Sequence, residues 1–118
     1  MKNNQEESIF DIIIIGFGVS GISLAAQSET HNLHYLVLER NTSFGGVWFD
    51  TTDNTCLQTH KKFYEFSDFP FPKTTRDHPN KQTVLTYLRN YIKFKKIDVT
   101  NRVLFNLNVN TINFKKKE

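Results

Sequence analysis

Hydrophobic and polar positions divide the chain into segments of different pattern. Residues 9–15 form an almost unbroken apolar run with isoleucine at positions 12 to 15, typical of a central strand buried on both faces of a parallel sheet. Small and apolar residues at 22 to 26 predict a short helix that ends near Asn32. Residues 34–39 predict a second strand, so residues 9–39 form one β-α-β unit.

The rest of the chain has weaker patterns. Residues 40–80 follow no sustained period and contain all three prolines, so we expect a long, mostly irregular loop that lines something functional. A helix is predicted to begin near Lys81, with Asn80 as its N-cap. Loose alternation of apolar residues over 103–114 predicts one or two further strands.

Composition limits the chain to one modest domain. The sequence has 118 residues, and 14% of them are aromatic, which is too many for a disordered chain. The formal net charge of +3 comes from a local excess of lysine near the end of the chain, where a solvated tail is expected and no nucleic-acid-binding module is recognisable. We predict a flexible N-terminus at 1–8, one domain at 9–114 and a basic tail at 115–118.

Several classes of protein are excluded by what the sequence lacks. The single cysteine, Cys56, rules out an internal disulfide framework, and no His or Cys spacing predicts a metal site. No apolar run approaches the roughly 18–20 residues that cross a bilayer, and residues 1–8 do not have the pattern of a signal peptide. These features predict a cytoplasmic protein with no metal and no membrane segment.

A glycine motif carries the first chemical signal. Gly16, Gly18 and Gly21 form GxGxxG directly after the first predicted strand and at the start of the first predicted helix, and Glu39 follows at the end of the second strand. This arrangement matches a dinucleotide-binding fingerprint. The pyrophosphate would bind the amides at the helix N-terminus, and Glu39 would accept hydrogen bonds from the ribose hydroxyls. The alternative is a tight strand-helix turn beside an unrelated glutamate.

Residues after Glu39 bear on the choice of nucleotide. The Glu39 carboxylate would repel a 2′-phosphate, which favours FAD or NAD over NADP, although the adjacent Arg40 weakens this exclusion. Gly46, Val47 and Trp48 follow in the loop, where glycine lets the backbone pass close to a flat cofactor and tryptophan supplies a packing wall. A plain turn with a core tryptophan is an equally good interpretation.

Taken together, the motifs resemble the amino-terminal part of flavin-containing monooxygenases over about residues 9–114. The resemblance rests on GFGVSG at 16–21, ER at 39–40, GGVW at 45–48, LQTHK at 57–61, FSDFP at 66–70 and VLTYL at 84–88. It implies a Rossmann-like, three-layer α/β domain that binds FAD and is incomplete here, with a long irregular loop after the second strand. It also implies a flavoprotein that uses NADPH and oxygen to oxygenate soft nitrogen or sulfur centres of small molecules.

The resemblance also assigns site residues. Gln58 stands where many members of the family have an asparagine near the flavin ring, and it is the candidate catalytic residue. A longer amide keeps the donor and acceptor chemistry but displaces it by about one methylene. The candidate cofactor-binding residues are Gly16, Gly18, Val19, Ser20, Gly21, Glu39, Arg40, Gly46, Val47 and Trp48.

The family's second GxGxxG motif, which serves NADPH, does not occur in the 118 residues. We therefore expect one dinucleotide site and no catalysis by this chain alone, with NADPH and substrate belonging to a full-length form. Two other hypotheses stay open. One is a non-catalytic nucleotide-binding module or truncated remnant that binds a partner through an unfinished sheet edge. The other is a small NAD-linked reductase.

Overall fold

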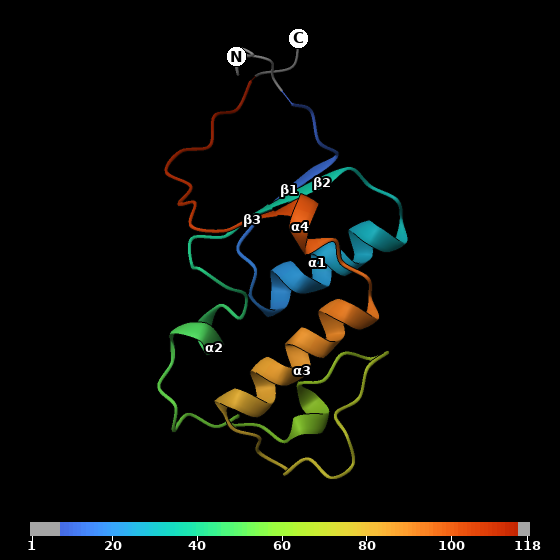
Figure 1. The fold of residues 1–118 in the computed structure, drawn as a ribbon, viewed down its shortest axis with the longest axis vertical. Helices are drawn as coiled ribbons and strands as arrows, with labels where there is room; N and C mark the ends of the chain where they lie inside the picture. The colour runs from blue at the N-terminus through green and yellow to red at the C-terminus, as the bar shows by residue number, and fades with distance from the viewer. Residues whose placement is uncertain (1–7, 116–118) are drawn as a thin grey trace.

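The computed structural model of the protein describes residues 8–115 and shows a small parallel sheet with helices on one face (Figure 1). Strands β1 (Ile12–Ile15), β2 (Tyr35–Leu38) and β3 (Val103–Leu104) lie in that order. Helix α1 (Val19–Thr30) connects β1 to β2, and helix α3 (Lys81–Phe94) lies between β2 and β3 in the chain. This arrangement confirms both the predicted β-α-β unit and the Rossmann-like α/β class.

The two faces of the sheet differ in their cover. Residues paired across parallel strands point to one face, and Ile14, Val37 and Val103 are all at most 5% exposed beneath the helices. On the other face Ile13 and Ile15 are 52% and 54% exposed. The prediction that the first strand is central and buried on both faces is therefore wrong for the described residues, where β1 is an edge strand. The described residues form two of the three predicted layers.

Helix α3 holds the irregular loop in place. It begins as predicted, because the Asn80 side chain accepts a hydrogen bond from the Thr83 N–H at 3.0 Å. The Tyr87 hydroxyl donates to the Phe69 carbonyl at 2.6 Å and accepts from the Phe66 N–H at 2.7 Å. A side chain of α3 thus satisfies two backbone hydrogen-bonding groups of the loop. It contains only two short helical turns, α2 (Val47–Asp50) and a 3-10 turn (Lys61–Phe63).

The end of the described chain differs from the prediction. A one-turn helix, α4 (Val99–Arg102), leads into β3, which has only two residues, and 105–115 form no strand. Asn106 has φ +60°, a left-handed conformation at which the chain turns from β3, and the backbone here hydrogen-bonds to Asn41 and Glu39 beyond the end of β2. The apolar alternation beyond it therefore has no neighbouring strand. Residues 1–7 of the predicted N-terminal segment and 116–118 of the predicted basic tail lie outside the described residues.

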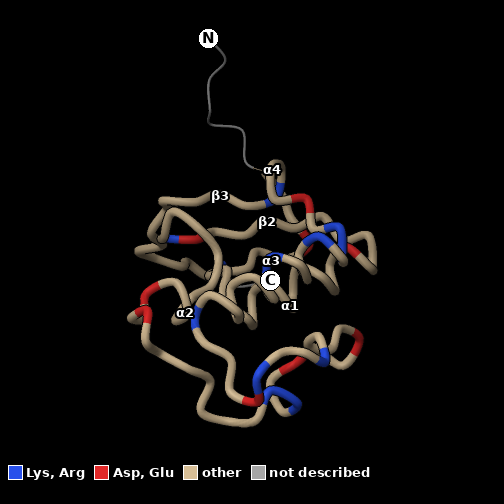
Figure 2. The backbone as a smooth tube through the Cα atoms, turned by 60° about the horizontal axis from the view of Figure 1, so that its bottom comes forward, with Lys and Arg blue, Asp and Glu red and all other residues tan. Residues whose placement is uncertain are grey.

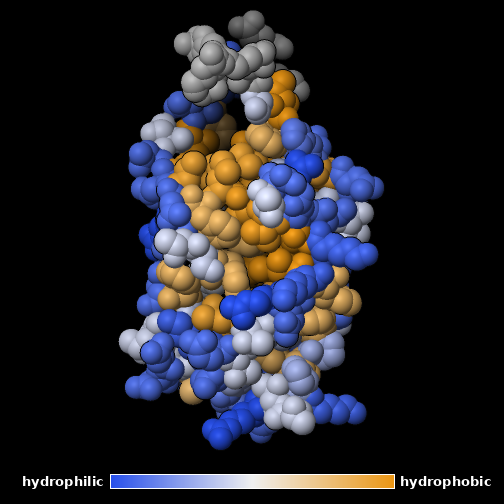
Figure 3. Space-filling model, in the orientation of Figure 1, coloured by the Kyte–Doolittle hydropathy of each residue, from blue (hydrophilic) through white to orange (hydrophobic). Residues whose placement is uncertain are grey.

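Within residues 8–115, charged residues are confined to helices, loops and turns. The three strands carry none along their lengths (Figure 2). None of the described helices is long and apolar enough to cross a bilayer. On the face seen in Figure 3, hydrophobic side chains gather over the sheet and toward α3, with hydrophilic ones around them.

Candidate dinucleotide site

The first glycine turn is tight because its residues need the space of hydrogen. Gly16 has φ +100°, which glycine adopts readily. A Cβ at Gly21 would lie 1.9 Å from the Gly16 carbonyl oxygen, so no larger residue fits there without moving the backbone. The turn brings the end of β1 against the start of α1, as the motif predicts.

Helix α1 presents unpaired amides at its N-terminus. The first backbone bond to its cap runs from the Ile22 N–H to the Gly18 carbonyl at 2.9 Å, and Gly18 has no side chain to cap the helix. Within the part of the chain that the structure describes, the N–H groups of Gly18, Val19, Ser20 and Gly21 therefore have no acceptor. They carry the positive end of a twelve-residue helix dipole, which is a suitable site for an anion.

The second glycine pair packs directly on this turn. The Gly45 N–H donates to the Phe17 carbonyl at 2.9 Å. A Cβ at Gly46 would lie 3.0 Å from the Gly18 Cα, and Gly46 has φ +56°. The close approach is thus between two stretches of backbone. The sequence reasoning expected glycine here for an approach to a cofactor; the structure also gives the pair a role in assembling the loops.

Glu39 ties the same loops to the end of β2. It is only 3% exposed, and its carboxylate oxygens accept from the Phe17 N–H at 2.6 Å and the Asn41 N–H at 2.7 Å. Its own N–H donates to the Leu104 carbonyl at 2.9 Å, and its carbonyl accepts from the Leu107 N–H at 3.0 Å. Glu39 therefore joins the glycine turn, the following loop and the chain after β3.

Three hollows run along these loops and meet at Val47, which is 73% exposed and lines all of them. We call them the strand-end hollow (about 450 Å³), the glycine hollow (about 380 Å³) and the loop hollow (about 280 Å³), and together the groove. The strand-end hollow includes Glu39 and Leu107. The glycine hollow includes the start of α1 and Trp48. The loop hollow includes Cys56 and Gln58.

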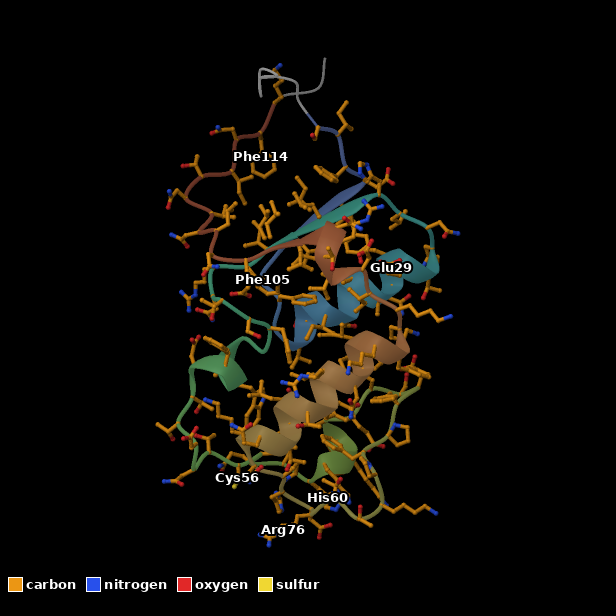
Figure 4. All side chains as sticks on the ribbon, viewed as in Figure 1. Glu29, Cys56, His60, Arg76, Phe105 and Phe114 are labelled. Atoms are coloured by element: carbon orange, nitrogen blue, oxygen red, sulfur yellow. The ribbon has the colours of Figure 1, made fainter. Side chains whose placement is uncertain are left out.

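The groove brings every candidate site residue together. The candidate cofactor-binding residues all line the strand-end or the glycine hollow, and Gln58 lines the loop hollow. The Gln58 side-chain N–H donates to the Cys56 carbonyl at 3.4 Å. Cys56 and Phe114 lie toward opposite ends of the molecule (Figure 4), so the groove extends from the sheet toward the end remote from Phe114.

Trp48 is a core residue, as one of its two interpretations expects, and the cofactor interpretation stays a prediction. Its side chain is buried, at 7% exposed, and its indole N–H donates to the Tyr64 hydroxyl at 2.9 Å. Trp48 also lines the glycine and loop hollows. Burial raises the pKa of Tyr64 to about 12, and the Trp48 hydrogen bond partly opposes the rise. Trp48 is therefore a core residue with one surface in the groove.

Sequence reasoning missed some of the lining. Tyr64 lines the glycine hollow, and Leu107, Asn108 and Val109 line the strand-end hollow. The latter three belong to the segment 103–114, for which the sequence predicts one or two strands. The structure instead turns the chain at Asn106, whose N–H donates to the Asn41 carbonyl at 3.0 Å, across the carboxyl ends of the strands. Arg40 forms an ion pair with Asp50 at 3.6 Å at the exposed rim.

A model of the family described as flavin-binding monooxygenase-like matches residues 10–118. The chain belongs to this family. A probable flavin-containing monooxygenase of Arabidopsis thaliana is 42% identical over 85 residues, which are 70% of this chain and 16% of the plant protein. The resemblance found from the motifs is confirmed.

Solved structures share the fold. A flavin-containing monooxygenase from Stenotrophomonas maltophilia superposes with a TM-score of 0.68 at 26% identity, covering 80% of this chain and 28% of that one. The complex of OTEMO with FAD and NADP gives a TM-score of 0.73 at 20% identity, covering 86% of this chain and 20% of that one. This 118-residue chain thus spans between 16% and 28% of the length of these proteins.

Proposed function

We propose that the chain is the FAD-binding part of a cytoplasmic flavin-dependent monooxygenase. The whole protein would use NADPH and oxygen to oxygenate soft nitrogen or sulfur centres of small molecules. Family membership supports this, as does the shared fold with a protein that binds FAD and NADP. The observation that carries the proposal is the groove, in which Glu39, unpaired helix amides and Gln58 follow one another.

The residues of the groove fit an extended dinucleotide. A diphosphate needs hydrogen-bond donors and positive potential, and the unpaired amides at the start of α1 supply both. Each Glu39 carboxylate oxygen accepts one protein N–H and has a further lone pair for a ribose hydroxyl. The glycines keep side chains out of the space in front of these groups. We therefore expect the adenosine at the strand-end hollow and the flavin toward Trp48 and Gln58.

When bound, FAD would supply the redox chemistry that transfers electrons from NADPH to oxygen. The chain's own residues would bind and orient it. Trp48 and Val47 would supply apolar surface against the bound cofactor, and the Gln58 amide has a donor and an acceptor that it could offer to it. The only GxGxxG motif of the 118 residues is the one proposed for FAD. We therefore expect this chain alone to bind FAD weakly and not to oxidise NADPH.

The proposal is tested by titrating the chain with FAD and following flavin fluorescence. Val47→Asp and Val47→Lys are a matched pair, because Val47 is exposed and faces all three hollows. A negative charge there should weaken FAD binding at least about tenfold by repelling the diphosphate, whereas a positive charge should not weaken it. Phe63→Asp, at an 87% exposed position outside the groove, is the control. Equal affinity for Val47→Asp and the wild type would refute the proposed site.

The alternative hypotheses give different results in the same titration. Binding of NAD without affinity for FAD would support an NAD-linked reductase. No binding of either nucleotide by a well-folded chain would favour the truncated remnant that binds a partner through its sheet edge. Oxidation of NADPH with oxygen uptake by this chain alone would show that the expectation of inactivity is wrong.

A further inference from the structure

A fourth hollow, of about 400 Å³, lies between α3 and the chain from Ile97 to Phe105. We call it the α3 hollow. It shares no lining residue with the groove. Its apolar lining includes the half-buried Phe44 and Phe105, and the fully buried Phe17 lies behind them. Phe17 and Phe44 come from the loops that form the groove. Figure 4 shows Phe105 next to the end of β3.

Three cations line the same hollow. Arg89 and Lys93 stand four positions apart in α3 and so lie on one side of it, and Lys96 follows just beyond the end of the helix, with φ +55°. The Arg89 guanidinium carbon is 5.7 Å from the centre of the Phe44 ring. Within residues 8–115 none of the three forms an ion pair with an acidic side chain. Their positive charge is therefore available to a ligand.

One acidic residue, Asp98, also lines the α3 hollow, but its carboxylate is engaged elsewhere. Its two oxygens accept from the Asn101 N–H at 3.2 Å and the Asn101 side-chain amide at 3.0 Å, which caps α4. Three cations thus face one carboxylate that already has partners. The hollow combines aromatic surface with an excess of positive charge.

We propose that the α3 hollow binds a small aromatic carboxylate, with its ring against the half-buried Phe44 and Phe105 and its carboxylate toward Arg89. The volume suits a small molecule and not a protein segment. A guanidinium pairs with a carboxylate through two parallel hydrogen bonds, which distinguishes an acid from its neutral amide. The proposal concerns a site outside the groove and does not depend on FAD binding.

The test compares phenylacetate, phenylacetamide and acetate as probes in two-dimensional NMR titrations of the ¹⁵N-labelled chain without FAD. Phenylacetate should shift the amide signals of Phe44, Arg89 and Phe105 in a saturable way. Phenylacetamide, which lacks the charge, should bind about tenfold more weakly, and acetate, which lacks the ring, should give no saturable shift. Equal binding of the acid and the amide, or shifts confined to the groove, would overturn the proposal.

Three variants distinguish binding at the α3 hollow from a general effect of positive charge on the affinity. Arg89→Gln and Lys93→Gln should each weaken phenylacetate binding, with Arg89→Gln having the larger effect because its guanidinium lies over the Phe44 ring. Lys62→Gln removes one positive charge from an exposed position outside the hollow and should leave the affinity unchanged. Unchanged amide spectra of the free variants show that each is folded. A loss of affinity in Lys62→Gln as large as in Arg89→Gln would also overturn the proposal.

Discussion

Glu39→Gln is the substitution that best tests how the candidate site is assembled. In the structure both carboxylate oxygens accept buried or half-buried backbone amides, one from Phe17 and one from Asn41. Glutamine has the same size but only one oxygen, so its NH₂ group must face one of these N–H groups. Two donors then oppose each other in a position that is 3% exposed. The variant should therefore destabilise the glycine turn even without nucleotide.

The magnitude follows from two effects. A buried amide left without an acceptor costs about 1–3 kcal/mol, and loss of the charge weakens the remaining hydrogen bond by about 1 kcal/mol. We expect a total loss of about 2–4 kcal/mol in the free energy of unfolding. Domains of this size are stable by only about 5–15 kcal/mol, so the effect is large.

Urea unfolding followed by circular dichroism measures this loss as a lower midpoint at unchanged slope. Asp53→Asn is the matched control, since it also replaces a carboxylate by an amide but at a side chain that is 88% exposed. The control should change stability by less than about 1 kcal/mol. If Glu39→Gln unfolds within about 0.5 kcal/mol of the wild type, the carboxylate does not hold the two loops, and the reasoning is wrong.

The parts of the site that could be predicted are those whose causes are local. The strand, the turn and the helix of GxGxxG depend on residues a few positions apart, and each glycine has a steric reason within the turn. The contact of Gly46 with Gly18 has no such local signal, because it joins two loops through tertiary packing. Glycine at both positions was visible in the sequence; their mutual approach was not.

The chain after β3 shows the limit of hydrophobic periodicity. Alternating apolar residues predict a strand only when a neighbouring strand accepts the hydrogen bonds. The turn at Asn106 removes this segment from the sheet and places Leu107 to Val109 over the strand ends. The burial of Lys61 also depends on a partner distant in the sequence, which the local pattern does not reveal. Its ammonium group donates to the carbonyl of Thr75, a partner within the irregular loop.

Three further predictions follow from single contacts. Gly46→Ala should destabilise the chain by about 1–3 kcal/mol in urea unfolding, because φ is +56° and the new Cβ would lie 3.0 Å from the Gly18 Cα. Tyr87→Phe should lose about 1–3 kcal/mol in the same assay, since two loop backbone groups lose their partner. Burial raises the pKa of Tyr64 to about 12, above the value of about 10 in the unfolded chain. The stability that the protonated Tyr64 side chain contributes is therefore complete below pH 10 and declines as pH rises toward 12. Tyr64→Phe should reduce this alkaline loss of stability, measured as urea midpoints against pH.

Gly18 and Gly46 have both a structural position and a place in the candidate site, and this limits which variants can test function. Gly18 and Gly46 border the groove and also allow the two loops to touch, so a substitution at either would weaken nucleotide binding through the fold alone. Glu39 has the same difficulty, because its carboxylate holds backbone amides. Val47 does not, since its exposed side chain lies in the groove at the first turn of α2. The pair Val47→Asp and Val47→Lys therefore tests nucleotide binding in the groove without disturbing the contacts that hold the two loops together.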